Sequence, residues 1–525
     1  MTAFQRRAAL VFLISASLDF SSSCSFLYAQ SPTPANSTQS IALLLPQLED
    51  YVKKGMQKTG VPGVAVAIVY QDKVVYLKGF GVRRAGESAP VDADTVFQLA
   101  SMSKPLASTV VATLVSAHMV SWDDKIVALD PEFKLSDANV TANVTIRDLL
   151  SHRSGLPTSA GDMLEDLGFS RPEILHQMRY LPMAGEFRKS FHYSNFAFTE
   201  GGIAPAKKVG ESWEELAEER LFKPLGMKET SYRWSDYRNA EDKADIHVLV
   251  DEMGMGKAVP RYLRNPDAEA PAGSASSSVR DLAQWVRLQL ADGKWNGKQI
   301  IAADVLAETH APQIERGKNP ATGNTSSYAI GWGLDQDPEG RLIVGHSGAF
   351  TSGAGTTVQM MPGDHLGIVV LTNAEPTGLA EAVAVEFLDL FHSGKESKDW
   401  LSVTGEQFKK VMASAYSGSK DYSKMPRPAA AAAAKPLSAY TGAYRNDYYG
   451  QIEITEDNGS LWMRLPAEGS LYSLTLWDGD TFVYRYKGEP GAMTRGVKFT
   501  LGDRPEVLVE NLAEEGSGTF TKVGP

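Results

Sequence analysis

Two residues with complementary chemistry stand three positions apart where a helix-like segment begins. Ser101 and Lys104 lie in the stretch QLASMSKPLAS, and the apolar run VVATLVSAHM follows closely. Residues three apart share one face of a helix, so both side chains can point into the same cleft. A serine hydroxyl is a poor nucleophile until a neighbouring base takes its proton. Pro105 places the helix start near Ser101, where a free backbone amide can bind an oxyanion.

The S-x-x-K spacing alone leaves two interpretations open. Ser417 and Lys420 have the same spacing, but they lie in a glycine-containing stretch with no apolar helix after it. In the alternative interpretation, Ser101 is an ordinary helix cap and Lys104 is a solvated surface residue. Partner groups elsewhere in the chain are needed to favour catalysis.

Two further motifs offer such partners. The stretch FHYSNFAF contains Tyr193 and Asn195, which supply a phenol and an amide, and IVGHSGAF places His346 after an apolar strand-like run. Neither tripeptide is specific by itself, since each pattern recurs in the chain. The second H-S-G begins at His392, where a histidine and a glycine suit a helix C-terminus. His152, at the end of the stretch LLSH, is interpreted as a structural residue.

Composition favours a soluble globular protein of two or three domains. The 525 residues are 43% hydrophobic and 22% charged. The net charge of −11 argues against a nucleic-acid-binding surface. No apolar run of membrane-spanning length follows the N-terminal segment, so we expect no integral membrane segment in the mature chain. The single cysteine, Cys24, lies within that segment, so disulfides and cysteine-ligated zinc are not expected.

Residues 1–30 have the features of a signal peptide. Arg6 and Arg7 precede the apolar stretch AALVFLISASL, which is too short to span a bilayer, and Ala29 offers a cleavage site. The alternative is a retained anchor or an unstructured N-terminus. We expect an exported protein, periplasmic or extracellular.

Strand-like segments are found at both ends of the main domain, with helix-like segments between them. GVAVAIVY and VVYLKGFG indicate a hairpin, and YAIGWGL, RLIVGH, TTVQMM and LGIVVLTN indicate late strands. TIRDLLSH and SWEELAEERLF begin with capping-box spacing. This order predicts an α/β fold in which both ends of the domain build one antiparallel sheet, with packed helices and a helical subdomain.

The C-terminal part changes in character. We expect a tether at 31–40, the main domain at 41–400, a helix and an Ala/Pro linker at 401–435, and a small all-β barrel at 436–525. Seven short alternating segments build the predicted barrel, ending with EVLVENL, and Asn458-Gly459 predicts a hairpin turn. Two roles remain open for this domain: it narrows access to the cleft, or it forms a homo-oligomer.

The order S-x-x-K, Y-x-N, H-x-G resembles the serine β-lactamase/penicillin-binding-protein superfamily. The branch is the one that holds class C β-lactamases, D-amino peptidases and related esterases. The strings VTIRDLLSHRSGLP and ERLFKPLGMKETSY are also similar to that branch, and the resemblance covers roughly residues 40–395. The terminal barrel is similar to the lipocalin-like domain appended to some of these hydrolases.

The resemblance implies a β-lactamase/DD-peptidase-like fold and a role for each motif residue. It makes Ser101 the acylated nucleophile, Lys104 its base and Tyr193 the group that moves protons to and from the leaving group. The implied substrate-binding residues are Asn195, His346, Ser347 and Gly348, and the implied oxyanion hole is formed by the backbone amides of Ser101 and Ala349. No metal or organic cofactor is implied.

His346 stands where β-lactamases of this branch usually carry lysine. A free histidine is mostly neutral above pH 7, so a substrate carboxylate is poorly compensated there. We therefore expect a serine hydrolase acting on a small-molecule or peptide ester or amide, with carboxylate substrates favoured only as His346 gains a proton toward pH 6. The alternatives are a D-amino-acid peptidase or DD-peptidase, a class C-like β-lactamase, and a non-catalytic penicillin-binding-like protein.

Overall fold

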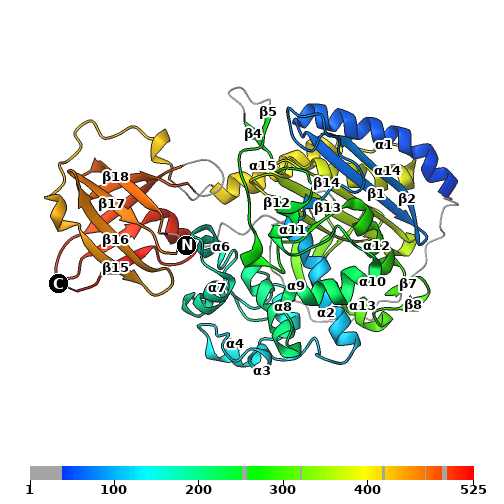
Figure 1. Ribbon diagram of the computed structural model, residues 1–525, viewed down its shortest axis with the longest axis horizontal. Helices are drawn as coiled ribbons and strands as arrows, with labels where there is room; N and C mark the ends of the chain where they lie inside the picture. The colour runs from blue at the N-terminus through cyan, green and yellow to red at the C-terminus, as the bar shows by residue number, and fades with distance from the viewer. Residues whose placement is uncertain are drawn as a thin grey trace.

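The computed structural model describes residues 38–250, 257–319, 322–416, 420–467, 469–487 and 493–524. The predicted signal peptide, Cys24, most of the predicted tether and Ser417 lie outside the described residues. The chain forms a large body of sheet and helices and a smaller β-barrel beside it (Figure 1). Among the described helices, none is long and apolar enough to cross a membrane.

The large body is built on an eight-stranded antiparallel sheet. Its strand order is β2-β1-β14-β13-β12-β11-β10-β9. The strands are β1 (Gly63–Tyr70), β2 (Lys73–Gly81), β9 (Ile314–Lys318), β10 (Thr325–Tyr328), β11 (Gly333–Gln336), β12 (Leu342–Phe350), β13 (Ala354–Met361) and β14 (Leu366–Thr372). The predicted fold class is confirmed, because β1 pairs with β14 and so joins the two ends of the domain in one sheet.

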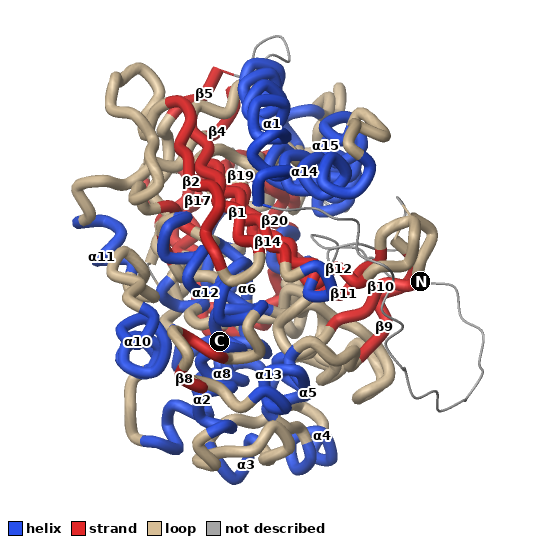
Figure 2. The backbone as a smooth tube through the Cα atoms, turned by 90° about the vertical axis from the view of Figure 1, so that its right-hand side faces the viewer, coloured by secondary structure: helices blue, strands red, loops and turns tan. Residues whose placement is uncertain are grey.

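Helices cover both faces of this sheet (Figure 2). One face packs against α1 (Thr38–Thr59) and α14 (Leu379–Ser393), with α15 (Trp400–Tyr416) against α14. The other face packs against α12 (Val279–Leu290), and α2 (Ser103–Ser116) lies on that side. Alternate residues of β1 are buried in the two separate cores, as a strand covered on both faces requires.

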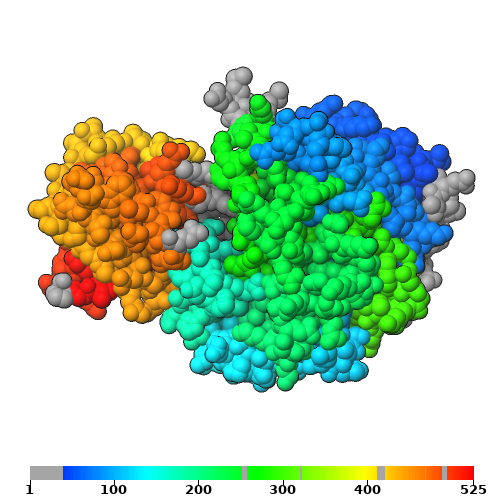
Figure 3. All heavy atoms as spheres, in the orientation of Figure 1, coloured from blue at the N-terminus to red at the C-terminus, as the bar shows by residue number. Residues whose placement is uncertain are grey.

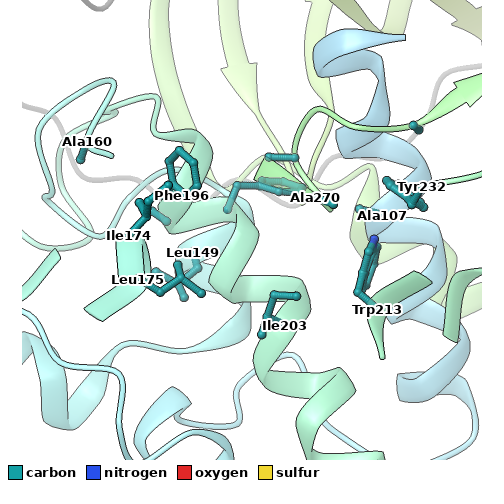
Figure 4. Packing of buried hydrophobic residues seen from close by; sticks show 14 of the residues in the cluster. Ala107, Leu149, Ala160, Ile174, Leu175, Phe196, Ile203, Trp213, Tyr232 and Ala270 are labelled. Atoms are coloured by element: carbon teal, nitrogen blue, oxygen red, sulfur yellow. The ribbon is translucent and has the colours of Figure 1, made fainter. Parts of the chain in front are cut away.

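A helical subdomain is inserted between β2 and β9. Its longest helix, α8 (Asn195–Val209), packs on α5 (Ile146–Leu150) and on α2. Phe196 and Ile203 of α8 lie in the apolar cluster shown in Figure 4. The Thr145–Asp148 capping box predicted from the sequence is formed. The helices between α2 and α12 are α3 (Ile126–Leu129), α4 (Ala138–Asn143), α5 (Ile146–Leu150), α6 (Asp162–Asp166), α7 (Arg171–Gln177), α8 (Asn195–Val209), α9 (Trp213–Ala217), α10 (Lys223–Leu225) and α11 (Trp234–Asn239).

Short elements complete the body. Helix α13 (Ala303–Thr309) packs on α2, and the 3₁₀ turn η2 (Ala100–Met102) leads directly into α2. Three two-stranded sheets pair β3 (Phe97–Gln98) with β6 (Ser276–Ser277), β4 (Val248–Val250) with β5 (Lys257–Val259), and β7 (Lys294–Trp295) with β8 (Lys298–Gln299).

The C-terminal segment forms a closed eight-stranded barrel in which β15 pairs with both β16 and β22. Its strands are β15 (Gly442–Asn446), β16 (Gly450–Asp457), β17 (Ser460–Arg464), β18 (Leu471–Asp478), β19 (Thr481–Arg485), β20 (Thr494–Thr500), β21 (Glu506–Val509) and β22 (Thr519–Lys522). Asn458 and Gly459 both have positive φ, as the predicted hairpin turn requires. The all-β barrel is thus confirmed, while its relation to lipocalins stays a prediction.

Two strand predictions were wrong in detail. YAIGWGL is not one strand: β10 ends at Tyr328 and β11 begins at Gly333, because the intervening loop packs on α2. Gly331 in that loop has φ 78°, and a Cβ there would lie 2.0 Å from Ser108 Oγ. The last barrel strand, β22, was missed because its four residues carry little apolar alternation, and EVLVENL leaves the strand at Val509 for a 3₁₀ turn.

Candidate active site

Ser101 sits on a strained turn that β12 supports from behind. Ala100, immediately before it, has φ 49°, a left-handed conformation that a residue with a side chain rarely adopts. Gly348 on β12 lies against this turn so closely that a Cβ there would be 2.0 Å from the Leu99 carbonyl oxygen. Thr356 on β13 adds a 2.7 Å hydrogen bond from its hydroxyl to that same carbonyl. Ser101 itself remains partly exposed, so a substrate can reach it.

Lys104 is fully buried beneath Ser101 and contacts three oxygen atoms. Its Nζ lies 3.2 Å from Ser101 Oγ, 2.6 Å from Asn195 Oδ1 and 3.2 Å from the Ala272 carbonyl oxygen. Burial lowers the pKa of Lys104 to about 7, against the opposing charges of Glu269 and Asp162. A neutral amine has two N–H bonds and one lone pair. The two bonds match the carbonyl oxygens of Asn195 and Ala272, which leaves the lone pair for the Ser101 proton.

Tyr193 lies over the same amine. Lys104 Nζ is 4.6 Å from the centre of the Tyr193 ring. Burial raises the pKa of the Tyr193 phenol, although the nearby Ser101 hydroxyl works in the opposite direction. The buried hydroxyl has no partner with full hydrogen-bond geometry among the described residues, as is common before a substrate binds. Tyr193 is therefore a neutral phenol beside a neutral amine at pH above 7.

Asn195, the first residue of α8, is held in one orientation. Its Nδ2 donates a 3.2 Å hydrogen bond to Asp162 Oδ1, so its Oδ1 is the atom that faces Lys104. Burial and the neighbouring carboxylates of Glu515 and Glu269 raise the pKa of Asp162 to about 7. Asp162, the first residue of α6, was not predicted as a site residue, because it lies 33 residues before Asn195 and outside the three motifs.

His346 lies at the back of the site, with both ring nitrogens occupied. Nε2 is 2.9 Å from the Tyr328 hydroxyl and Nδ1 is 2.7 Å from the Ser347 carbonyl oxygen. A carbonyl only accepts, so Nδ1 carries the proton and Nε2 accepts from Tyr328. Burial, together with the positive charges of Lys104 and Arg316, lowers the pKa of His346 to about 3. The expected protonation of His346 near pH 6 is therefore wrong.

The neighbours of His346 on β12 divide between the two faces of the sheet. His346, Gly348 and Phe350 are buried toward the Ser101 face. The Ser347 side chain points the other way, because strand side chains alternate, and its hydroxyl donates a 3.1 Å hydrogen bond to Thr357. A substrate contact of Ser347 could thus come only from its backbone. The oxyanion hole predicted from the amides of Ser101 and Ala349 stays a prediction.

His152 holds Tyr193 in place. Its ring lies 4.3 Å from the Tyr193 ring, and its Nδ1 accepts a 3.3 Å hydrogen bond from the Ser194 amide. Burial lowers the pKa of His152 well below its ordinary value, so it is a neutral packing group, as the sequence interpretation expected. The motifs thus bring together Ser101, Lys104, Tyr193, Asn195, His346 and Gly348.

Other features of the body lie apart from this site. A hollow of about 520 Å³ between α7, α8 and α9 is lined by residues such as Arg171 and Trp213, and none of the predicted site residues lines it. Within the described part of the chain, no group of three or more His, Cys, Asp or Glu side chains is arranged to hold a metal ion.

Comparison with known proteins places this geometry in a family. The sequence model of the β-lactamase family matches residues 48–390, which hold every predicted site residue. The chain belongs to the β-lactamase family. A second model, a domain of unknown function named DUF3471, matches residues 426–510, which hold most of the barrel.

Relatives of this β-lactamase-family chain carry hydrolase and penicillin-binding names. Unguisins hydrolase ungD′ of Aspergillus campestris (strain IBT 28561) is 27% identical over 78% of this chain and 77% of its own length. Penicillin-binding protein 4 of Amycolatopsis lactamdurans is 27% identical over 63% of this chain and 84% of its own length. The octameric penicillin-binding protein homologue from Pyrococcus abyssi shares the fold, with a TM-score of 0.60 and 21% identity over 91% of this chain and all of its own. The predicted membership of the serine β-lactamase/penicillin-binding-protein superfamily is confirmed.

Proposed function

We propose that this protein hydrolyses an ester or amide through an acyl-enzyme formed on Ser101. The observation that carries the proposal is the contact of Ser101 Oγ with Lys104 Nζ at 3.2 Å, in surroundings that lower the pKa of that amine to about 7. An ordinary lysine is almost fully protonated at pH 7 and cannot act as a base. Lys104 is poised to do so near neutral pH, where general bases are most effective.

During acylation, Lys104 and Tyr193 each carry out one proton transfer. Lys104 accepts the Ser101 proton as Oγ attacks the carbonyl carbon, forming the Ser101 ester and breaking the bond to the leaving group. Tyr193, neutral because its pKa is raised, is placed to donate a proton to the departing oxygen or nitrogen. The phenolate then recovers a proton from Lys104, whose Nζ lies 4.6 Å from the centre of the Tyr193 ring, and this transfer restores the neutral pair.

Deacylation reverses these roles. A water molecule takes the place of the leaving group, and its proton passes to the Lys104–Tyr193 pair as its oxygen attacks the acyl carbon. The bond from the acyl carbon to Ser101 Oγ then breaks, Oγ regains a proton, and the carboxylic acid leaves. Both halves use the same two groups because they pass through similar tetrahedral intermediates.

His346 offers no positive charge to a substrate carboxylate at the β12 end. His346 is neutral throughout the physiological range and has no free ring nitrogen to offer. Losing one charge-assisted contact costs about 1.5–3 kcal/mol, which is roughly a tenfold to hundredfold loss of affinity. We propose that uncharged esters or amides are preferred over penicillins and cephalosporins.

A hydrolase acting on unguisins is the second candidate, favoured by one finding. The similarity to Unguisins hydrolase ungD′ covers 430 residues, more than the 343 residues from 48 to 390 that the family model matches, so it extends beyond the hydrolase domain. Unguisins therefore belong in the substrate panel, beside D-amino-acid amides and β-lactams.

The test is covalent labelling followed by a substrate panel. A fluorophosphonate probe should label Ser101, as mapped by mass spectrometry, and Ser101→Ala should remain unlabelled. Turnover is then compared across p-nitrophenyl esters, D-amino-acid amides, unguisins, penicillins and cephalosporins. Absence of labelling and of turnover in the wild-type protein would favour the non-catalytic penicillin-binding-like alternative.

Export is part of the proposal. Its support is the N-terminal pattern of Arg6, Arg7 and a short apolar stretch, which lies outside the described residues. The mature N-terminus, sequenced from the protein recovered outside the cytoplasm, should begin near residue 30. Recovery of an uncleaved chain in the cytoplasm would contradict export.

A further inference from the structure

The C-terminal barrel contacts the active-site body beside Asn195. Tyr448 and Tyr486 of the barrel share one apolar cluster with Met163 and Leu181 of the body. In Figure 3 the yellow-to-red barrel meets the teal part of the surface, which contains α6 and α7. This contact buries a carboxylate from the barrel, Glu515, which is 7% exposed.

Glu515 accepts hydrogen bonds from both sides of Asp162. One oxygen accepts from the Gly161 amide and from the Tyr448 hydroxyl, and the other accepts from the Met163 amide at 2.6 Å. The Tyr448 hydroxyl also accepts a 3.2 Å hydrogen bond from the Gly161 amide. The backbone on either side of Asp162 is therefore fixed by the barrel.

The loop before α6, residues 158–161, is fixed from its opposite side to the segment that carries Tyr193 and Asn195. The Ser159 amide donates a 2.9 Å hydrogen bond to the Tyr193 carbonyl oxygen. Gly161 has φ 96°, and a Cβ there would lie 2.5 Å from the Phe196 ring, next to Asn195. Figure 4 shows Ala160 of this loop close to Phe196. The loop thus lies between the barrel carboxylate and the start of α8.

We propose that Glu515 is a positioning residue of the Ser101 site: it holds the Gly161–Met163 segment at the start of α6 so that Asp162 orients the Asn195 amide toward Lys104. The path consists of direct hydrogen bonds, from Glu515 to the backbone around Asp162, from Asp162 to Asn195 at 3.2 Å, and from Asn195 to Lys104 at 2.6 Å. The hydrolase body therefore needs the docked barrel for full activity. This inference rests on the proposed role of Ser101.

Glu515→Gln is the most informative variant, because it keeps the size of the side chain and removes one hydrogen-bond acceptor. A glutamine has an NH2 group in place of one oxygen, so this group would face either the Gly161 or the Met163 amide, donor against donor. The readout is the rate at which a fluorophosphonate labels Ser101 at pH 8.5, well above the pKa values near 7 of Lys104, Asp162 and Glu515. Since a misplacement of about 1 Å can cost about 100-fold in rate, we expect labelling to slow by about 10- to 100-fold.

Controls separate positioning from folding. Glu453→Gln changes an exposed glutamate on β16 of the same barrel and should label at the wild-type rate. Tyr448→Phe keeps the aromatic packing and removes one donor to Glu515, so it should slow labelling in the same direction but less. Should Glu515→Gln fail to fold, a wild-type labelling rate in Tyr448→Phe would overturn the proposal.

A double-mutant cycle with Asp162→Asn tests the path itself. If Glu515 acts through Asp162, the double variant should be slowed no more than Asp162→Asn alone. Slowing equal to the product of the two single effects would overturn the path.

Hydrogen exchange provides a readout that does not depend on activity. The peptide containing Gly161 and Met163 should exchange faster in Glu515→Gln than in the wild type, whether or not Ser101 is the nucleophile. Wild-type labelling of Ser101 with an unchanged rate in Glu515→Gln would refute the barrel's role and leave the proposed function standing. No labelling of the wild-type protein at all would refute the proposed function instead.

Discussion

The two ends of the active site each bury a basic nitrogen, but in different electrostatic surroundings. Lys104, on α2, faces the carboxylates of Glu269 and Asp162, which offset part of the burial and leave its pKa at about 7. His346, on β12, has its pKa lowered to about 3 by burial, and the positive charges of Lys104 and Arg316 add to this effect. Burial alone does not make a base useful near neutral pH. Burial is the largest cause in both cases: it brings an amine with an ordinary pKa of about 10.4 into the neutral range, and it takes an imidazole with an ordinary pKa of about 6.5 out of that range. The neighbouring carboxylates then raise the pKa of Lys104, and the neighbouring cations lower the pKa of His346 further.

The largest expected effect is at the nucleophile. Ser101→Ala should reduce turnover to background. Among the described residues, the Ser101 hydroxyl is the one hydroxyl group that forms a hydrogen bond with Lys104 Nζ. Ser101 is partly exposed, so the free energy of unfolding should change by only about 0.5 kcal/mol. Ser347→Ala is the matched control, since its side chain lies on the opposite face of β12. Loss of turnover in Ser347→Ala with retention in Ser101→Ala would reverse the assignment.

The next largest effect on turnover is expected at Tyr193, the proposed general acid. Tyr193→Phe removes the phenolic proton and keeps the ring that packs on Lys104 and His152. We expect kcat to fall by about 10²- to 10⁴-fold, the usual contribution of a general acid. Steady-state kinetics on an ester and on an amide check this, and the amide should suffer more because its nitrogen needs the proton to leave. Equal rates for Tyr193→Phe and the wild type would exclude the role.

A smaller effect is expected at Glu269, a carboxylate whose charge acts on Lys104. The negative charge of Glu269 raises the pKa of Lys104, so Glu269→Gln should lower it. Lys104 then stays unprotonated at lower pH, and the acid limb of the kcat/KM profile should move to lower pH. A move to higher pH would show that Glu269 acts on another group. The variant leaves the ion pair of Arg264 with Glu165 in place, so we expect it to stay folded, and melting curves check this.

The smallest expected effect is at the β12 end. Because the pKa of His346 is about 3, its charge does not change between pH 5.5 and 8.5. The ratio of kcat/KM for a neutral ester to that for a cephalosporin should therefore stay constant over this range, since the titration of Lys104 affects both substrates alike. A ratio that falls toward pH 5.5 would show that His346 becomes charged and that the site is more open than its burial indicates.

Sequence alone predicted the parts of the fold that follow from local patterns. The hairpin of β1 and β2, the capping box at Thr145 and the turn at Asn458 depend on neighbouring residues, and each is found in the structure. The motif residues were predicted because their spacing is short and chemically distinctive. The split at Tyr328 was not predicted, because it depends on contact with α2, far away in the sequence.

The surroundings that tune the site could not be predicted from the sequence. Glu269 and Asp162 act on Lys104 from other elements, and Glu515 joins them from a domain more than 300 residues later. Tyr328, which occupies His346 Nε2, belongs to a neighbouring part of the sheet. Long-range pairs of this kind leave no periodic or motif signal. The prediction that His346 would titrate near pH 6 failed for this reason, since it assumed a solvent-exposed ring.

The central claim is that neutral Lys104 activates Ser101, and the pH dependence of acylation tests it most directly. The rate of the acylation burst with a p-nitrophenyl ester should rise about tenfold per pH unit below pH 7 and level off above it, as a base with a pKa of about 7 requires. Lys104→Arg, whose side chain cannot lose its proton, should abolish the burst. A burst rate that does not change between pH 5 and 9, or that survives in Lys104→Arg, would contradict the account.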